Sequence, residues 1–268
     1  MDEQQDVIGE LEAAGVLAGI RWAYRAAAGR TLEIFSEADG HDAALLGNIR
    51  YTLFRDRLDR VFACEAYDLQ PDSAPTDHLD LLYAELSQED VNAMPHLAPD
   101  FVRRDDLTGS PGWAVEGRRF LLASCAFGKL DELPWPRKSP TKQRVARQRQ
   151  PNPAQFSLFD DAADTEIAGL EELLASAYRL DLDTFVVAHT LDSVSHGSEL
   201  VFGSPVFNSG GGQAWAWRHD LLAGPPIDGG RLRGDGPLPT GPNLVPDAPV
   251  RLRPKAVEQP ADRASGEA

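Results

Sequence analysis

The sequence predicts a mixed α/β (α+β) protein with two small modules, a basic linker that contains proline, and a disordered tail rich in proline and glycine. Apolar residues recur at helical spacing early in the chain, and short apolar runs bounded by turn residues follow as strands. A central stretch combines proline with uncompensated positive charge. The expected boundaries are 1–135 for the first module, 136–163 for the linker, 164–223 for the second module and 224–268 for the tail.

The first module is expected to begin with helices. Apolar residues recur at helical spacing from Asp6 to Ala28, where three glycines weaken the case for one continuous helix. The pattern is clearest from His41 to Tyr67, where charged residues are expected mostly on the solvent side: Arg50, Arg55, Asp56, Arg57 and Asp59. A short strand or helical turn at 79–86 follows, and residues 87–90 have the capping-box pattern that opens another helix.

Strands are expected to complete both modules. Residues 113–116 and 120–127 are predicted as two strands joined at Gly117, and the second is a continuous apolar run typical of burial on both faces. In the second module, a helix at 164–180 precedes strands at 184–190 and 199–207 around a polar turn. From residue 224 onward proline and glycine dominate, which is the composition of a disordered tail.

The length and charge of the chain restrict its class. Its 268 residues suffice for one large domain or two small ones. A net charge of −16 predicts repulsion from nucleic acid and anionic membranes unless basic groups gather locally. The acidic N-terminus, and the lack of an apolar run near the roughly 20 residues of a membrane helix, predict a cytoplasmic protein with no membrane partner. Cys64 and Cys125 lie in apolar runs, which predicts buried, reduced thiols.

The linker concentrates positive charge. No acidic residue lies between Leu133 and Phe159, and five prolines argue against one long helix and favour an extended, exposed segment. Its basic side chains are candidates for contact with the DNA backbone, with a solvated, charge-balancing linker as the alternative. These candidates are Arg137, Lys138, Lys142, Arg144, Arg147 and Arg149.

The linker leads to the peptide Gln155-Phe156-Ser157-Leu158-Phe159. This peptide resembles the motif with which bacterial polymerases, mismatch-repair proteins and other clients dock on the replicative sliding clamp: Gln, any residue, Ser or Asp, Leu, Phe. The resemblance implies that Gln155 is the polar anchor and that Leu158 and Phe159 fill a hydrophobic pocket. Extended peptides with clustered apolar anchors are a common recognition mode. Alternatively, the apolar side chains hold the linker against a flanking module.

Two polar groups are weaker candidates for metal chemistry. Glu33, Glu37, Asp39 and His41 could bind a divalent metal for phosphodiester chemistry. The alternative is a polar loop before a helix N-terminus, where carboxylates serve as caps. His189 and His196 flank a predicted hairpin turn, with His219 beyond, but they lack the spacing of metal ligands.

The sequence carries no phosphate loop, dinucleotide-binding loop or nucleophile elbow. We therefore expect a non-enzymatic accessory protein of DNA replication or repair that docks on the sliding clamp and needs no cofactor. One alternative is a metal-dependent nuclease, or another DNA-modifying enzyme, that the same peptide delivers. Another is a binding module unrelated to DNA, in which the peptide is part of the core.

Overall fold

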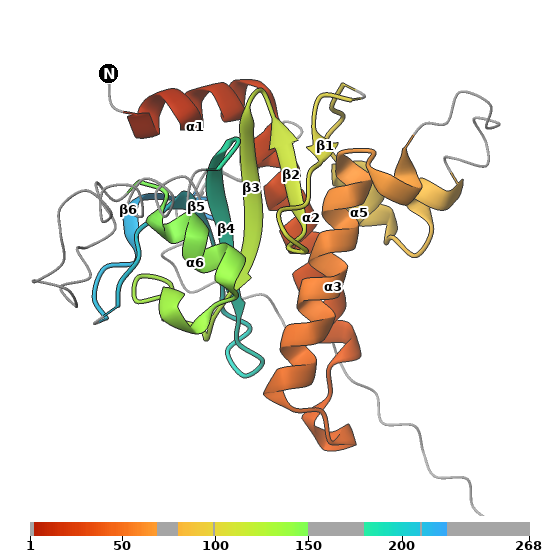
Figure 1. Cartoon of the computed structure of the whole chain (residues 1–268). Helices are drawn as coiled ribbons and strands as arrows, with labels where there is room; N and C mark the ends of the chain where they lie inside the picture. Colours follow the sequence, from red (N-terminus) through yellow and green to blue (C-terminus); the bar gives the residue numbers. More distant parts are fainter. Residues whose placement is uncertain (1–2, 69–79, 99, 150–179, 210, 224–268) are drawn as a thin grey trace, which may run out of the picture. The chain divides into compact units, whose positions relative to one another are not determined.

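A six-stranded mixed sheet organises the fold (Figure 1). The computed structural model describes residues 3–68, 80–98, 100–149, 180–209 and 211–223. These residues all belong to one structural unit, Met1–Gly229, and the second unit, Gly230–Ala268, lies outside them. The strand order is β1-β2-β3-β4-β5-β6, and every neighbouring pair is antiparallel except β3 and β4. Helices combined with this sheet confirm the predicted α+β class.

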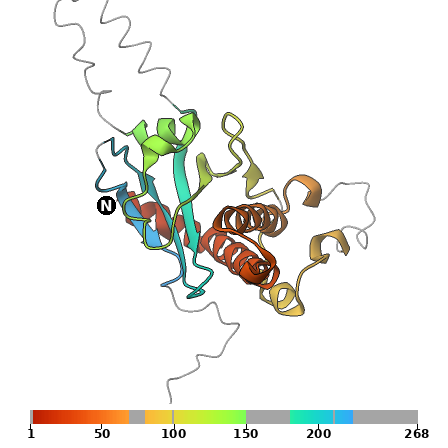
Figure 2. The ribbon, with the colours of Figure 1, turned by 90° about the horizontal axis from the view of Figure 1, so that it is seen from below.

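The three longest helices among the described residues come before the sheet in the chain: α1 (Glu3–Ala13), α2 (Val16–Ile34) and α3 (Ala43–Val61). Gly15 separates the first two with a φ of 76°, which glycine adopts without steric cost. The expected element at 6–28 therefore covers parts of two helices. Figure 2 shows α2 and α3 on one side of the strands and α6 (Pro140–Arg147) on the other.

The charged residues of α3 do not lie mostly on its solvent side as expected. Arg50, Arg57 and Asp59 are only 4%, 3% and 8% exposed. Leu46, Arg50 and Phe54 are four residues apart and share one helix face, so Arg50 is carried into the core with its apolar neighbours. The predicted apolar face of this helix was therefore too narrow, because it left out Arg50 and Phe54.

Short helices and turns connect the longer elements. They are η1 (Glu37–Asp39), η2 (Glu65–Tyr67) and α5 (Gln88–Ala93). Ser87 Oγ accepts a hydrogen bond from the backbone N–H of Asp90 at 3.0 Å, which confirms the predicted helix start. Residues 80–83 are helical, so the ambiguous segment at 79–86 contains a helical turn.

The N-terminal half of the sheet is formed by β1 (Arg103–Arg104), β2 (Gly112–Val115) and β3 (Arg118–Ser124). Glu116 and Gly117 connect β2 to β3 with φ angles of 48° and 81°. Two successive positive φ angles are typical of the tight turn that matches the twist of a hairpin. The predicted hairpin at Gly117 is confirmed.

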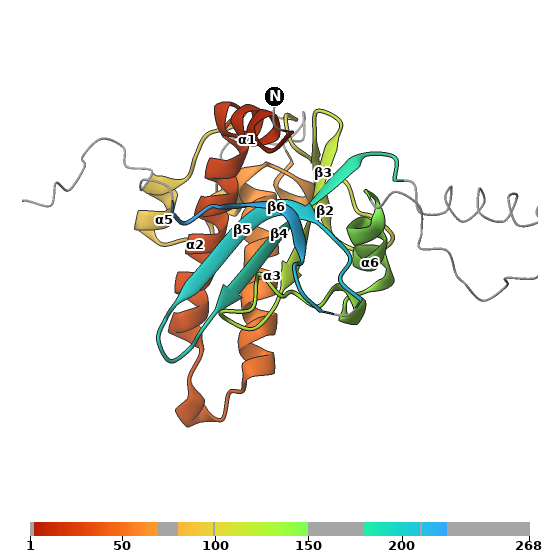
Figure 3. The ribbon, with the colours of Figure 1, turned by 90° about the vertical axis from the view of Figure 1, so that its left-hand side faces the viewer.

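The other half is formed by β4 (Asp183–Leu191), β5 (Ser198–Pro205) and β6 (Trp215–Asp220). The hairpin predicted from residues 184–207 is confirmed, and in Figure 3 it lies in front of α2 and α3. In the parallel pair, Phe120 lies opposite Phe185 and Leu122 opposite Val187. The strands expected in two modules thus share one sheet, because both faces of β3 are buried and its free edge requires a neighbour.

Each face of the sheet has its own hydrophobic core. Alternate residues of β4 divide between them: Phe185 and Val187 pack with the helices α1 to α3, and Val186 and Ala188 pack on the α6 side. The α6 side also holds two tryptophans, including Trp135 in η3 (Trp135–Arg137). Within the described ranges, no helix has the length and apolar character needed to cross a membrane.

The first part of the predicted linker is folded rather than extended. Residues 140–147 form α6, in which Val145 and Ala146 are buried against the sheet. Ser139 caps this helix and Pro140 occupies its first turn, where a missing N–H has no cost. This proline therefore starts a helix. The helix expected at 164–180 and the tail from 224 lie outside the described residues.

Candidate functional site

The clamp-like peptide at 155–159 lies outside the described residues, in the connection between α6 and β4. The two ends of this connection are held together. The side chain of Gln148 donates to the backbone oxygen of Thr184 and accepts from its N–H at 3.2 Å. Arg119 in β3 also pairs with Asp181 at 2.9 Å. The described residues on either side of segment 150–179 are therefore adjacent.

Several of the basic residues predicted to face DNA contact the folded unit. Lys138 donates a hydrogen bond to a backbone carbonyl at the end of β3. The guanidinium of Arg147 lies 3.4 Å from the ring centroid of Phe207, and Arg149 forms an ion pair with Glu3. The other three are exposed or half-buried: Arg137, Lys142 and Arg144. Lys138, Arg147 and Arg149 therefore make contacts within the folded unit.

The residues of the proposed metal cluster have other contacts. Glu33 pairs with an arginine of the same helix at 2.9 Å, and Glu37 accepts a hydrogen bond from a serine of the β4–β5 turn at 3.1 Å. Nδ1 of His41 accepts a backbone hydrogen bond, and Asp39 lies in the short helix η1. Asp42 caps α3, as in the capped-loop alternative. In the described part of the chain, no three His, Cys, Asp or Glu side chains are grouped as metal ligands.

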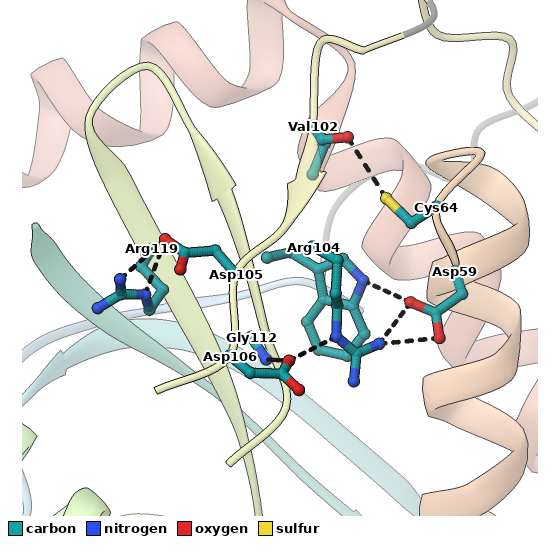
Figure 4. A network of polar contacts seen from close by, with 9 residues as sticks. Asp59, Cys64, Val102, Arg104, Asp105, Asp106, Gly112 and Arg119 are labelled. Carbon is teal, nitrogen blue, oxygen red and sulfur yellow. Dashed lines mark hydrogen bonds and ion pairs between the residues drawn. The ribbon is translucent and has the colours of Figure 1, made fainter. Parts of the chain in front are cut away.

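A buried ion pair joins α3 to the edge of the sheet (Figure 4). Nη1 of Arg104 donates to both oxygens of Asp59 at 2.6 and 2.8 Å, and the indole N–H of Trp113 donates to the same carboxylate at 2.9 Å. Nε of Arg104 also donates to Asp106 at 2.6 Å. These contacts connect α3, β1 and β2 through one carboxylate.

Burial and hydrogen bonding act in opposite directions on the pKa of Asp59, and also on the pKa of Arg104. Burial raises the pKa of Asp59, although Arg104 and Trp113 act in the other direction. Burial would lower the pKa of Arg104, but its hydrogen bonds with Asp106 and Asp59 raise it. We treat the pair as charged because three hydrogen bonds from two donor nitrogens, Nη1 of Arg104 and Nε1 of Trp113, converge on the carboxylate and favour its ionised form. The pair is a structural connection between helix and sheet.

Both cysteines are free thiols. Cys64 is buried, and its Sγ lies 3.4 Å from the backbone oxygen of Val102, as Figure 4 shows. Burial raises the pKa of Cys64 to about 12 and that of the half-buried Cys125 to about 11. Both therefore stay protonated near neutral pH, which makes them poor nucleophiles and metal ligands.

The three histidines of the C-terminal half do not converge. His196 is exposed in the β4–β5 turn. His219 in β6 lies opposite Phe202 on the neighbouring strand β5. His189 is fully buried and faces α2 and α3. The ring of His189 is surrounded by Phe54, Tyr24 and Tyr51, at centroid distances of 5.1, 6.0 and 6.5 Å.

Buried polar groups without partners lie around His189. Neither ring nitrogen of His189 has a hydrogen-bond partner among the described residues. Nη1 of Arg50 donates to the backbone oxygen of Leu191 at 3.4 Å, but its Nε is buried without a partner and no described carboxylate pairs with it. Burial, with the nearby charges of Arg50, Lys142 and Lys138, lowers the pKa of His189 well below 6.5. His189 is therefore neutral at pH 7.

The chain matches no protein-family model, no curated protein and no solved structure. Its function is therefore inferred from its own residues. The sequence did not indicate the His189 and Arg50 cluster, because the two residues are 139 positions apart and Arg50 was assigned to solvent. Arg50 lies four residues from both Leu46 and Phe54, and this helical spacing could have predicted that Arg50 is buried with them.

Proposed function

We propose that this protein is a non-enzymatic accessory of DNA replication or repair that docks on the bacterial sliding clamp through residues 155–159. The observation that carries the proposal is the pairing of Gln148 with Thr184 at the base of the connection that contains the peptide. This pairing holds Gln148, which precedes segment 150–179, against Thr184, which follows it.

The contact between Gln148 and Thr184 also supports a form of docking that leaves the fold intact. β3 and β4 pair directly over seven residues each, and Gln148 fixes the chain before the peptide begins. A partner can therefore bind the peptide without separating these strands. The motif supplies one polar anchor, Gln155, and two adjacent apolar anchors, Leu158 and Phe159, which suit an extended peptide in a cleft.

Docking would place the acidic protein beside DNA in the cytoplasm. The net charge of −16 disfavours direct binding to DNA, so a protein partner that already encircles DNA would overcome this repulsion. Arg137 is exposed at the end of η3, just before α6, and is a candidate for phosphate contact. Such contacts would add affinity that weakens as the salt concentration rises.

Replacing both Leu158 and Phe159 with alanine is expected to abolish a micromolar complex with the purified bacterial clamp, because the apolar anchors would be lost. Isothermal titration calorimetry measures the complex. The matched control is Phe156→Ala, which removes an aromatic side chain at the variable second position and should leave affinity almost unchanged. Thermal unfolding of all three proteins should be the same.

Two results would contradict the proposal. A wild-type chain that does not bind the clamp removes its basis. A double variant that unfolds at a lower temperature than Phe156→Ala would instead place the peptide in the core. Cleavage of DNA that needs a divalent metal and is lost in Asp39→Ala would support the enzyme alternative, with the peptide used for delivery.

A further inference from the structure

We propose that Arg50 and His189 form a binding site for a small oxyanion at the carboxyl ends of β3 and β4. This site is separate from the docking peptide, and either proposal can fail without the other. Its two main residues are 4% and 0% exposed and come from α3 and β4. It would bind the phosphate or carboxylate group of a small molecule.

The first argument is the unused hydrogen-bonding capacity of the two side chains. Nε of Arg50 and both ring nitrogens of His189 are buried without a partner among the described residues. Buried polar groups are nearly always satisfied, because leaving one unpaired costs the free energy of its lost hydration. A buried guanidinium without a carboxylate is especially unfavourable. An oxyanion would satisfy both residues at once.

The second argument is the position of the cluster in the sheet. β3 and β4 are the parallel pair, and Ser124, the last residue of β3, lies opposite His189, two residues before the end of β4. Arg50 reaches the same edge, since it donates to the backbone oxygen of Leu191. Ligands of open sheets with parallel strands commonly bind beyond the carboxyl ends of the strands. Ser124 and Cys125 are only half-buried, so this edge is open to solvent.

The third argument is the sign of the charge. Arg50, Lys138 and Lys142 all act on His189, and each of them lowers its pKa through positive charge. The nearby carboxylate belongs to Glu199, and its Oε2 already accepts hydrogen bonds from Thr190 Oγ1 and from a backbone N–H, both at 2.9 Å. The surroundings are therefore electropositive in a chain whose net charge is −16. Such a local excess favours an anion.

The chemistry of the residues indicates an oxyanion rather than a halide. The planar guanidinium of arginine presents N–H groups in a fork that matches two oxygens of a phosphate or carboxylate. A neutral imidazole has one N–H donor and one acceptor nitrogen, so His189 can donate to an oxyanion or accept from a protonated one. Tyr24 does not compete, because its hydroxyl donates to the backbone oxygen of Thr190.

The test is titration of the full-length protein with inorganic phosphate, and separately with acetate, in a buffer free of other oxyanions at constant ionic strength. We expect saturable binding of one anion per chain by calorimetry and a rise in melting temperature that saturates over the same range. Arg50→Met should weaken binding at least about tenfold, the loss expected for one hydrogen bond to a charged group. The matched control is Arg55→Met, which removes an exposed guanidinium from the same helix and should leave binding unchanged.

The melting temperature without added anion separates a binding role from a structural one. Arg50→Met should then melt no lower than wild type, because the change removes an unpaired buried charge. Three results would overturn the proposal: no saturable response to either anion, Arg50→Met binding as tightly as wild type, or Arg50→Met unfolding more readily than wild type in the anion-free buffer. A response to phosphate alone, or to acetate alone, identifies the group that the site accepts.

Discussion

Replacing Asp59 with alanine is expected to lower the free energy of unfolding by about 3–5 kcal/mol, the usual effect of removing one partner from a buried ion pair. The guanidinium of Arg104 would remain largely buried, with 14% of its side chain exposed, and the indole N–H of the fully buried Trp113 would lose its acceptor. Chemical denaturation followed by tryptophan fluorescence measures the change.

The control for this prediction lies in the same network. Asp106 also accepts a hydrogen bond from Arg104, but 48% of its side chain is exposed, so water can replace it. Asp106→Ala should therefore cost no more than about 1 kcal/mol. A second test replaces both buried partners, Asp59→Leu with Arg104→Met, and should recover much of the lost stability, because no buried charge is left unpaired. Equal losses in Asp59→Ala and Asp106→Ala would show that burial does not determine the effect.

Local sequence patterns predicted individual elements well. The turn at Gly117 was found because its backbone requires positive φ, and the cap at Ser87 because its hydroxyl satisfies a free N–H of the first turn. Both signals depend on residues only a few positions apart. The hairpin of β4 and β5 was predicted for the same reason, since two apolar runs surround a polar turn.

Long-range pairings were not predictable in this way. Nothing near Phe120 or Phe185 specifies that the two lie side by side, because a parallel pair forms across a long crossover in the chain. Because no local pattern indicated that β3 pairs with β4, the strands on either side of the crossover were assigned to two modules. Pro140 was taken as evidence for an extended linker, although proline is equally favourable in the first turn of a helix.

The candidate site depended on burial of polar residues, which composition does not reveal. Arg50 and Asp59 were expected in solvent because charged residues are usually exposed. Asp59 is buried because Arg104 and Trp113, more than forty residues later, supply its hydrogen bonds. Arg50 is buried without such a partner. This difference separates the structural pair from the proposed anion site.

Stability is expected to fall as the pH decreases below about 6.5 because His189 is buried as a neutral side chain. Its pKa in the folded protein is well below 6.5, the value expected for the unfolded chain. Between these values the unfolded chain binds a proton that the folded protein does not, so acidification favours unfolding. The penalty is nearly absent at about pH 7.5, where the histidine is neutral in both states, and it reaches up to about 1.4 kcal/mol at about pH 5.5.

The surroundings of His189 keep their charge over this interval. Arg50, Lys138 and Lys142 stay protonated, and burial keeps Tyr24 and Tyr51 neutral by raising their pKa values. Denaturant unfolding at the two pH values, in a buffer without added phosphate or carboxylate, measures the effect. His189→Gln should remove the loss because glutamine does not titrate, whereas the exposed His196→Gln should retain it. An unchanged pH dependence in His189→Gln would mean that another group causes the loss.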